Sequence, residues 1–212
     1  MESGQNGEKT QRGPNRPGIK RRQAILNSAE ELLQGSSFLE ISYADIAARA
    51  GLPVSSCYHY YRDKFEVFQA LDRNLSEKFA SHFDFESNQW LGMDSWLHAI
   101  DIYTQKCREF TSQHPLAGEL WFKGKLPAEI SPTASRDFGI AQRFESMLNR
   151  QFELPDIPNR SGIFYCAWEI FEHVMASIWL TNLERDWIFE EANKATKAYL
   201  GHYLPLALPR RG

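Results

Sequence analysis

The sequence lacks the short patterns that are typical of membrane proteins and of common enzyme classes. No window approaches the roughly 18 continuous apolar residues of a membrane span, and the N-terminus has no apolar signal-peptide core. The HExxH, P-loop, GxSxG and GxGxxG patterns are all missing, so the sites that they build are not expected. We therefore expect a cytoplasmic protein with no membrane partner, no cofactor and no catalytic residue.

Cysteine is scarce, and its spacing argues against disulfides and metal sites. Cys57, Cys107 and Cys166 form no CxxC pair, and an odd number of widely separated cysteines does not suggest a disulfide framework. The six histidines never lie four residues apart, as metal-binding pairs on a helix do. We predict buried free thiols and no metal site.

The chain also has little excess charge of either sign. Its 212 residues include 24 Lys and Arg against 27 Asp and Glu, a net charge of -3, and that average argues against a nucleic-acid partner. The average conceals an asymmetry, however. Residues 1–64 hold nine basic and seven acidic side chains (+2), and residues 65–212 hold fifteen and twenty (-5), which together restore -3. A mildly basic part is therefore joined to an acidic part.

The spacing of apolar residues predicts an all-α protein. Residues 1–18, with four glycines and two prolines, predict a disordered basic tail. Helical spacing then begins at Ile25, and Gly35 is placed to end that helix in a left-handed cap. Ser131-Pro132 predicts a later helix start. Residues 161–180 are apolar on nearly every face, a last helix is expected at about 186–203, and no strand pattern occurs.

The pattern between Ser42 and Tyr61 predicts a helix-turn-helix. Ser42 and Asp45 form a capping box, Gly51 supplies a turn, and a second short helix begins at Val54. About seven helical residues, roughly 10 Å long, fit a major groove about 12 Å wide. Its side chains carry hydrogen-bonding groups and no acid. Packing tyrosines in an ordinary helical hairpin are the alternative interpretation.

Residues 20–71 resemble the DNA-binding domain of the TetR (tetracycline-repressor) family of bacterial transcription regulators. The residues that carry the resemblance are Ile25-Leu26 with Ala29, Gly35, Ile46-Ala47, Ala50-Gly51, Tyr58-x-Tyr60-Tyr61, and Asp63-Lys64 before Phe65 to Leu71. The resemblance implies a three-helix DNA-binding domain at 19–64, whose third helix is the recognition helix. It further implies a larger helical domain at 65–212 that binds a small molecule and dimerises through its last two long helices.

The resemblance also implies particular DNA contacts. Phosphate contacts would fall on Ser42, Ser56, Tyr58 and Lys64, and base contacts on Tyr43, Val54, Ser55, His59 and Tyr60. Three positions depart from the family pattern. Pro53 stands where a capping Ser is frequent, Val54 where a polar residue is frequent, and Cys57 where Leu or Val is usual. These departures concern sequence preference more than DNA binding itself.

A basic run precedes the first predicted helix. Six basic residues and no acidic one lie between Lys9 and Arg22. The run is either an arm that reaches the minor groove or the phosphates, or a solvated tail with no specific role, and the sequence favours neither interpretation.

The second domain is rich in aromatic residues, which suits a mostly apolar ligand pocket. The candidate lining residues are Trp96, Ile100, Tyr103, Trp121, Phe144, Met147, Trp168, Phe171 and Glu172. Each of them could instead be an ordinary core residue. Glu172 and His173 interrupt the nearly all-apolar helix, and a buried ionisable group there needs a partner.

The leading hypothesis is a homodimeric transcriptional regulator, a repressor, that a small and mostly apolar effector releases from a pseudo-palindromic operator. The dimer is expected to use the helices around 161–180 and 186–203. Two alternatives stay open. One is an all-α enzyme that uses Glu172 and His173 as acid and base, and the other is a helical interaction module without specific DNA binding.

Overall fold

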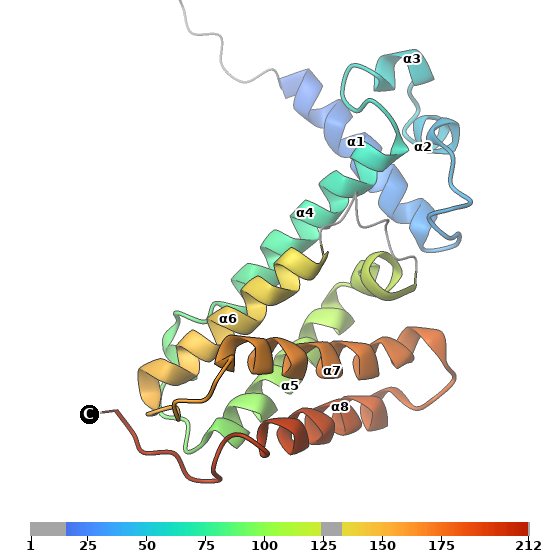
Figure 1. The fold of residues 1–212 in the computed structure, drawn as a ribbon. Coiled ribbons are helices and arrows are strands. Elements are labelled where there is room, and N and C mark those ends of the chain that lie inside the picture. The colour runs from blue at the N-terminus through green and yellow to red at the C-terminus, as the bar shows by residue number, and fades with distance from the viewer. Residues whose placement is uncertain (1–15, 124–132, 212) are drawn as a thin grey trace, which may run out of the picture.

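The computed structural model describes residues 16–123 and 133–211, and the regular elements in these residues are all helices (Figure 1). In chain order the elements are α1 (Arg16–Leu33), α2 (Tyr43–Arg49), α3 (Val54–Cys57), α4 (Lys64–Phe83), the 3-10 turn η1 (Asn88–Trp90), α5 (Trp96–Gln113), the π-helical turn η2 (Gly118–Lys123), α6 (Thr133–Gln151), α7 (Arg160–Leu180) and α8 (Arg185–Leu200). The described ranges contain no strand, only an isolated antiparallel bridge between Phe152 and Arg210. The predicted all-α class is confirmed.

The helices form two groups that α4 joins. Helices α1, α2 and α3 gather at one end of the molecule, and α4 runs from them toward the other end, where α5, α6, α7 and α8 lie (Figure 1). Helices α7 and α8 are side by side and make the most extensive contact between any two elements. None of the described helices is long and apolar enough to cross a membrane.

The first helix differs from its prediction at both ends. Because α1 begins at Arg16, the prediction of a disordered tail is wrong for residues 16–18, and residues 1–15 lie outside the described part. Pro17 is tolerated because the first turn of a helix does not use its N–H groups within the helix. The predicted left-handed cap at Gly35 is also wrong. Gly35 and Ser36 both donate to the carbonyl of Leu32, at 3.2 and 3.0 Å, and only Gly51 and Gly92 among the described glycines have positive φ.

The start of α4 belongs to the packing of the three-helix group. Asp63 caps α4 by accepting from the Glu66 N–H at 2.9 Å. One turn further on, the Phe68 ring packs edge-on against Phe38, with centroids 5.0 Å apart. Farther along α4, the buried carboxylate of Asp72 accepts from the Trp121 indole N–H at 2.8 Å. A single helix therefore contacts both groups.

The C-terminal segment packs across the ends of α5 and α6. Helix α8 ends at Leu200, and tight turns follow, in which the Tyr203 N–H donates to the Leu200 carbonyl at 2.9 Å. Beyond them the Pro205 carbonyl accepts from the Trp96 indole N–H at 2.8 Å. The predicted helix start at Ser131-Pro132 lies outside the described residues; the helix itself is described from Thr133.

The burial of the three cysteine thiols agrees only in part with the prediction. Cys57 and Cys107 are buried, whereas Cys166 is exposed. The reason is local: α7 buries the stripe that contains Phe164 and Ala167, and Cys166 lies outside that stripe.

Candidate functional sites

The first candidate site is the hairpin of α2 and α3. The predicted capping box is confirmed: the Asp45 N–H donates to the Ser42 hydroxyl at 3.1 Å, and the Ser42 N–H donates to the Asp45 carboxylate at 2.9 Å. The Ser42 hydroxyl also donates to the Asp45 carboxylate at 2.6 Å, and this bond, followed by the bond from the Ser42 N–H, lowers the pKa of Asp45. Gly51, with φ of 66°, makes the turn in a conformation that a side chain disfavours. The hairpin is therefore fixed at both its start and its turn.

The third helix is shorter than predicted. Its α-helical part spans only Val54–Cys57, and tighter turns continue it, because His59 and Tyr60 donate to carbonyls three residues back at 3.3 and 2.9 Å. Pro53 stands at the N-cap and provides no side-chain cap, as expected from its lack of a polar group. The N–H groups of Ser56 and Cys57 donate instead to the Pro53 carbonyl, at 2.9 and 3.2 Å, so backbone bonds hold the start of this helix.

The outer side of α3 carries the polar residues that the sequence singled out. Ser55, Tyr58 and His59 are exposed, and Tyr58 keeps 57% of its surface accessible. Beneath them Cys57 and Tyr61 are buried in the core. The remaining candidates on this segment, Val54, Ser56 and Tyr60, are half-buried.

Tyr43 has a structural role that the sequence did not reveal. Its hydroxyl donates to the Tyr61 carbonyl at 2.6 Å, and its ring lies 5.2 Å from that of Tyr58. Partial burial is the main cause that raises the pKa of Tyr43 to about 12. The hydroxyl thus stays protonated and holds α2 against the end of the third helix.

Lys64 likewise points inward. Its Nζ donates to the carbonyls of Ile41, Phe38 and Leu39 at 2.7, 3.2 and 3.4 Å, and it lies 5.0 Å from the centre of the Phe38 ring. An ammonium group has three donors, so these carbonyls use all of them. A contact with a DNA phosphate would have to replace at least one of these bonds.

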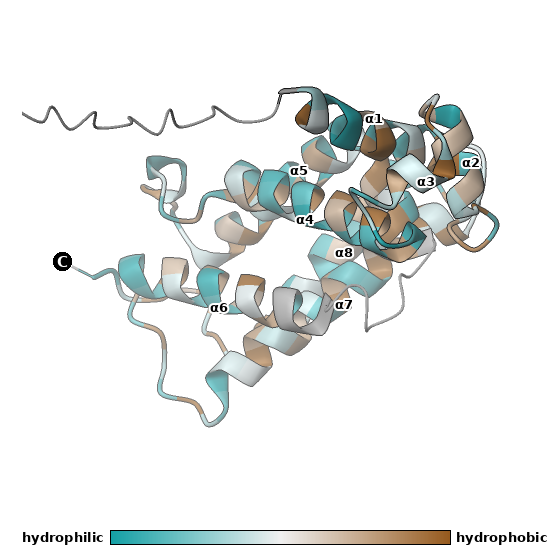
Figure 2. Ribbon diagram, turned by 90° about the horizontal axis from the view of Figure 1, so that it is seen from above, coloured by the Kyte–Doolittle hydropathy of each residue, from teal (hydrophilic) through white to brown (hydrophobic). Residues whose placement is uncertain are grey.

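The basic run before the hairpin continues into α1, whose first turns are strongly hydrophilic (Figure 2). Lys20 and Arg21 are exposed there. Arg22 instead turns toward the hairpin, where it donates to the Tyr60 carbonyl at 3.3 Å and lies 5.0 Å from the centre of the Tyr61 ring. One residue of the run therefore supports the hairpin, and two present free charge beside it.

The second candidate site consists of two small, mostly apolar cavities around α5, α6 and α7. The first has a volume of about 30 Å³ and is lined by Ile100, Tyr103, Ala141, Phe144, Phe164, Ala167, Trp168, Phe171, Thr196 and Leu200. The second has about 20 Å³ and shares Tyr103, Trp168 and Phe171 with the first, and Trp121 and Glu172 also line it. Each is large enough for one or two waters.

Two of the predicted lining residues lie elsewhere. Trp96 is fully buried, donates to the Pro205 carbonyl, and is not among the described residues that line either cavity. The same is true of Met147, which is a core residue. The candidates from the sequence did not include Phe79, Phe110 and Phe164, which also line the cavities.

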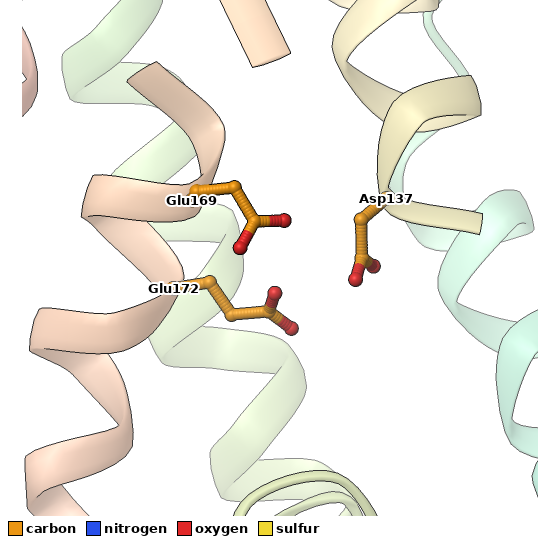
Figure 3. Close-up of side chains that lie close together, drawn as sticks. All are labelled: Asp137, Glu169 and Glu172. Atoms are coloured by element: carbon orange, nitrogen blue, oxygen red, sulfur yellow. The ribbon is translucent and has the colours of Figure 1, made fainter. Parts of the chain in front are cut away.

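Three carboxylates meet beside the second cavity. Asp137 on α6 faces Glu169 and Glu172 on α7, and their nearest oxygens all lie within 4.8 Å of one another (Figure 3). Oxygen ligands of this kind suit a hard divalent cation, which the sequence-based expectation of no metal did not consider. His173 is exposed rather than buried, and its ring lies 3.5 Å from Glu169. The prediction of a buried His173 is therefore wrong.

A third feature is the uncovered surface of α7. Its buried stripe consists of Phe164, Ala167, Phe171 and Met175 only. Other apolar residues of this helix, including Ile170, Val174 and Ile178, are half-buried, and Leu180 is 62% exposed. On α8, which packs beside α7, Trp187 is 48% exposed.

Comparison with known proteins relates the first part of the chain to a protein family. A sequence model described as bacterial regulatory proteins, tetR family, matches residues 25–71, which span α1 to the first turns of α4. This segment of the chain is similar in sequence to the tetR family, and the family model matches no residue outside it. No curated protein matches its sequence.

Solved structures of TetR-family proteins share the fold over most of their length. A TetR-family transcriptional regulator from Streptomyces coelicolor is 21% identical with a TM-score of 0.63, and the match covers 87% of this chain and 99% of that one. A TetR-family regulator from Syntrophomonas wolfei is 16% identical with a TM-score of 0.67, covering 86% and 96%. The multidrug binding protein EbrR, complexed with imidazole, is 15% identical with a TM-score of 0.55, covering 82% and 94%.

Proposed function

We propose that this chain is a TetR-family transcriptional regulator that binds double-stranded operator DNA through its α2–α3 hairpin. The observation that carries the proposal is the capped hairpin with Ser55, Tyr58 and His59 on its open side. Serine and tyrosine hydroxyls bind phosphates, and an imidazole can reach a base edge in the major groove. The division into a DNA-binding domain at 19–64 and an effector domain at 65–212 belongs to this proposal.

The nine proposed DNA-contact residues divide into two roles. We propose that DNA contacts are made by the exposed residues Ser42, Ser55, Tyr58 and His59 and by the half-buried residues Val54, Ser56 and Tyr60. Tyr43 and Lys64 act indirectly, because their polar atoms hold the hairpin together. Lys20 and Arg21 on α1 add positive charge close to the same side, which supports the arm interpretation of the basic run.

We propose that the regulator is a homodimer through α7 and α8. A helix that is apolar on most of its surface is stable when a second surface covers it, and one chain fully buries only one stripe of α7, leaving Ile170 half-buried and Leu180 exposed. Sedimentation at micromolar concentration should find a dimer. Ile170→Lys should shift it to monomer, and Ile19→Lys, which changes an exposed residue of α1, should leave it dimeric. A wild-type monomer would contradict the proposal.

We further propose that a small, mostly apolar molecule binds at the cavities and releases the protein from its operator, so that the protein acts as a repressor. The cavities lie among α5, α6 and α7, and α4 connects this part to the hairpin. EbrR, a multidrug binding protein of the same fold, supports a ligand in this domain. An effector that binds more tightly when α4 is displaced from its DNA-bound position would lower the affinity for DNA. The free energy that couples effector binding to DNA binding is expected to be about 1–3 kcal/mol.

Fluorescence anisotropy with the duplex upstream of its own gene tests DNA binding. We expect binding that is tighter than to a random duplex and weakens with salt. His59→Ala should lower the preference for the upstream duplex by roughly 1–3 kcal/mol if the imidazole reads a base. His98→Ala removes an exposed histidine of α5 and should have no effect. Equal binding of both duplexes by the wild type would favour a helical interaction module instead.

A further inference from the structure

Two polar hydrogens are buried without an acceptor in the wall between the two cavities. The Tyr103 hydroxyl belongs to a side chain that is 4% exposed, and neither it nor the Trp168 indole N–H has an oxygen or nitrogen acceptor within hydrogen-bonding distance. Both residues line both cavities, and their rings meet edge-on with centroids 5.0 Å apart. Buried donors in proteins almost always have partners, so two in one wall need an explanation.

The polar groups around this pair are already in use. The Thr196 hydroxyl donates to the Ala192 carbonyl and the Thr111 hydroxyl to the Cys107 carbonyl, each at 2.8 Å. The Cys107 thiol lies close enough to affect the pKa of Tyr103, but sulfur is a weak acceptor. Burial raises the pKa of Tyr103 well above its ordinary value, so its hydroxyl keeps the proton that it can donate. The wall therefore offers two donors at one place.

The side chains around the two donors indicate what kind of ligand could bind there. Tyr103 is surrounded by rings: Phe171 lies 5.3 Å away and Phe144 5.7 Å away, centroid to centroid. Aromatic walls of this kind favour a flat aromatic molecule. Asp137 and Glu172 also line the second cavity and would repel an anion, so the oxygen that accepts from the two donors is expected to be neutral. Neither cavity alone is large enough for a ring, so the wall of Tyr103 and Trp168 must shift and merge them.

We propose that the Tyr103 hydroxyl and the Trp168 indole N–H are the polar anchor of the effector site, and that the ligand is a neutral aromatic compound with a carbonyl oxygen. The oxygen would accept from both donors while the ring occupies the merged cavity. Only the ligand's role as effector rests on the proposed function; its binding does not depend on DNA.

A matched pair of probes tests the anchor. Acetophenone and α-methylstyrene have nearly the same shape, but only acetophenone has an oxygen acceptor. In titrations of the full-length, ¹⁵N-labelled protein, acetophenone should bind about tenfold more tightly than α-methylstyrene. The Trp168 indole proton, assigned with Trp168→Phe, should move downfield with acetophenone only, because it forms a hydrogen bond.

Tyr103→Phe is the decisive variant. It should lower the preference for acetophenone several-fold while the affinity for α-methylstyrene stays the same, since only the hydroxyl is removed. Tyr165→Phe is the control: it makes the same change on α7 at a residue that is not among the described lining residues of either cavity. Wild-type protein that binds both probes equally, or neither, would overturn the proposal. A preference that Tyr103→Phe leaves unchanged would also overturn it.

DNA binding is measured separately, so the two proposals fail in different ways. One outcome is that the protein binds acetophenone more tightly than α-methylstyrene, as expected, while saturating acetophenone leaves operator binding unchanged. That result would support the anchor and overturn the effector role. If the protein does not recognise its upstream duplex, the proposed function fails, while the probe titrations still decide the anchor.

Discussion

Removal of the Lys64 ammonium should destabilise the protein rather than weaken one DNA contact. The side chain starts in the first turn of α4 and reaches three carbonyls of the segment between α1 and α2. Lys64→Met keeps the aliphatic stem but removes every donor. The carbonyl of Ile41, at 2.7 Å, loses its closest charged partner.

The size of the effect follows from those contacts. Hydrogen bonds to a charged group contribute about 1.5–3 kcal/mol, and three carbonyls that share one half-buried ammonium are closer to one such contribution than to three. The position over the Phe38 ring adds roughly 0.5 kcal/mol. We expect a loss of about 2–3 kcal/mol. At about 2–4 °C per kcal/mol for a protein of this length, the melting temperature should fall by about 4–12 °C.

Calorimetry and DNA titration together distinguish a structural role of Lys64 from a contact between Lys64 and a DNA phosphate. Lys78→Met, on the exposed side of the same helix, is the matched control and should leave the melting temperature within about 1–2 °C of the wild type. Below the melting temperature, the salt dependence of operator binding should be the same for wild type and Lys64→Met. An unchanged melting temperature, together with a log–log salt slope shallower by about one unit per subunit, would show that Lys64 binds a phosphate and would refute this reasoning.

Three further predictions concern local structure. Ser42→Ala removes the cap of α2 and should cost about 1 kcal/mol in thermal unfolding, whereas Ser55→Ala should have almost no effect. Gly118→Ala places a Cβ 1.8 Å from Trp179 Nε1 and should cost about 1–3 kcal/mol, with a changed near-ultraviolet dichroism; an unaltered melt would contradict the packing of η2 on α7. The Asp45 pKa is lower when folded, so its stabilising effect is present above the unfolded pKa and is lost as the pH falls through the folded value; an NMR titration should find a pKa below about 3.9.

The hairpin could be predicted from the sequence because its signals are local. The capping box spans four residues, and the turn needs only Gly51. The inward roles of Tyr43 and Lys64 could not be predicted, because their acceptors lie 18 and 23–26 residues away in the chain. Residue spacing alone does not show which polar side chains form hydrogen bonds within the folded hairpin. The predicted DNA contacts at these two positions therefore stay the least supported.

The cavities show a similar limit. Periodicity shows which residues of a helix are apolar, but it does not show which part of an apolar face borders empty space. Trp96 and Ile100 lie one turn apart on α5, yet Ile100 lines a cavity and Trp96 packs under the C-terminal segment. Likewise Asp137 and Glu172 are 35 positions apart, and only the packing of α6 against α7 brings them together.

Helix α4 sets a geometric scale for any signal between the two groups of helices. Its 20 residues form a rod about 30 Å long, with the Phe38 contact near one end and the Asp72–Trp121 bond in its first half. Each degree of tilt about one end moves the other by about 0.5 Å. A tilt of only about 10° would displace the hairpin by nearly half the width of a major groove. Because Asp72 lies about 17 Å from the far end of α4 and Lys64 about 29 Å, a shift of about 1 Å beside Trp121 becomes about 1.7 Å at the hairpin end of the helix.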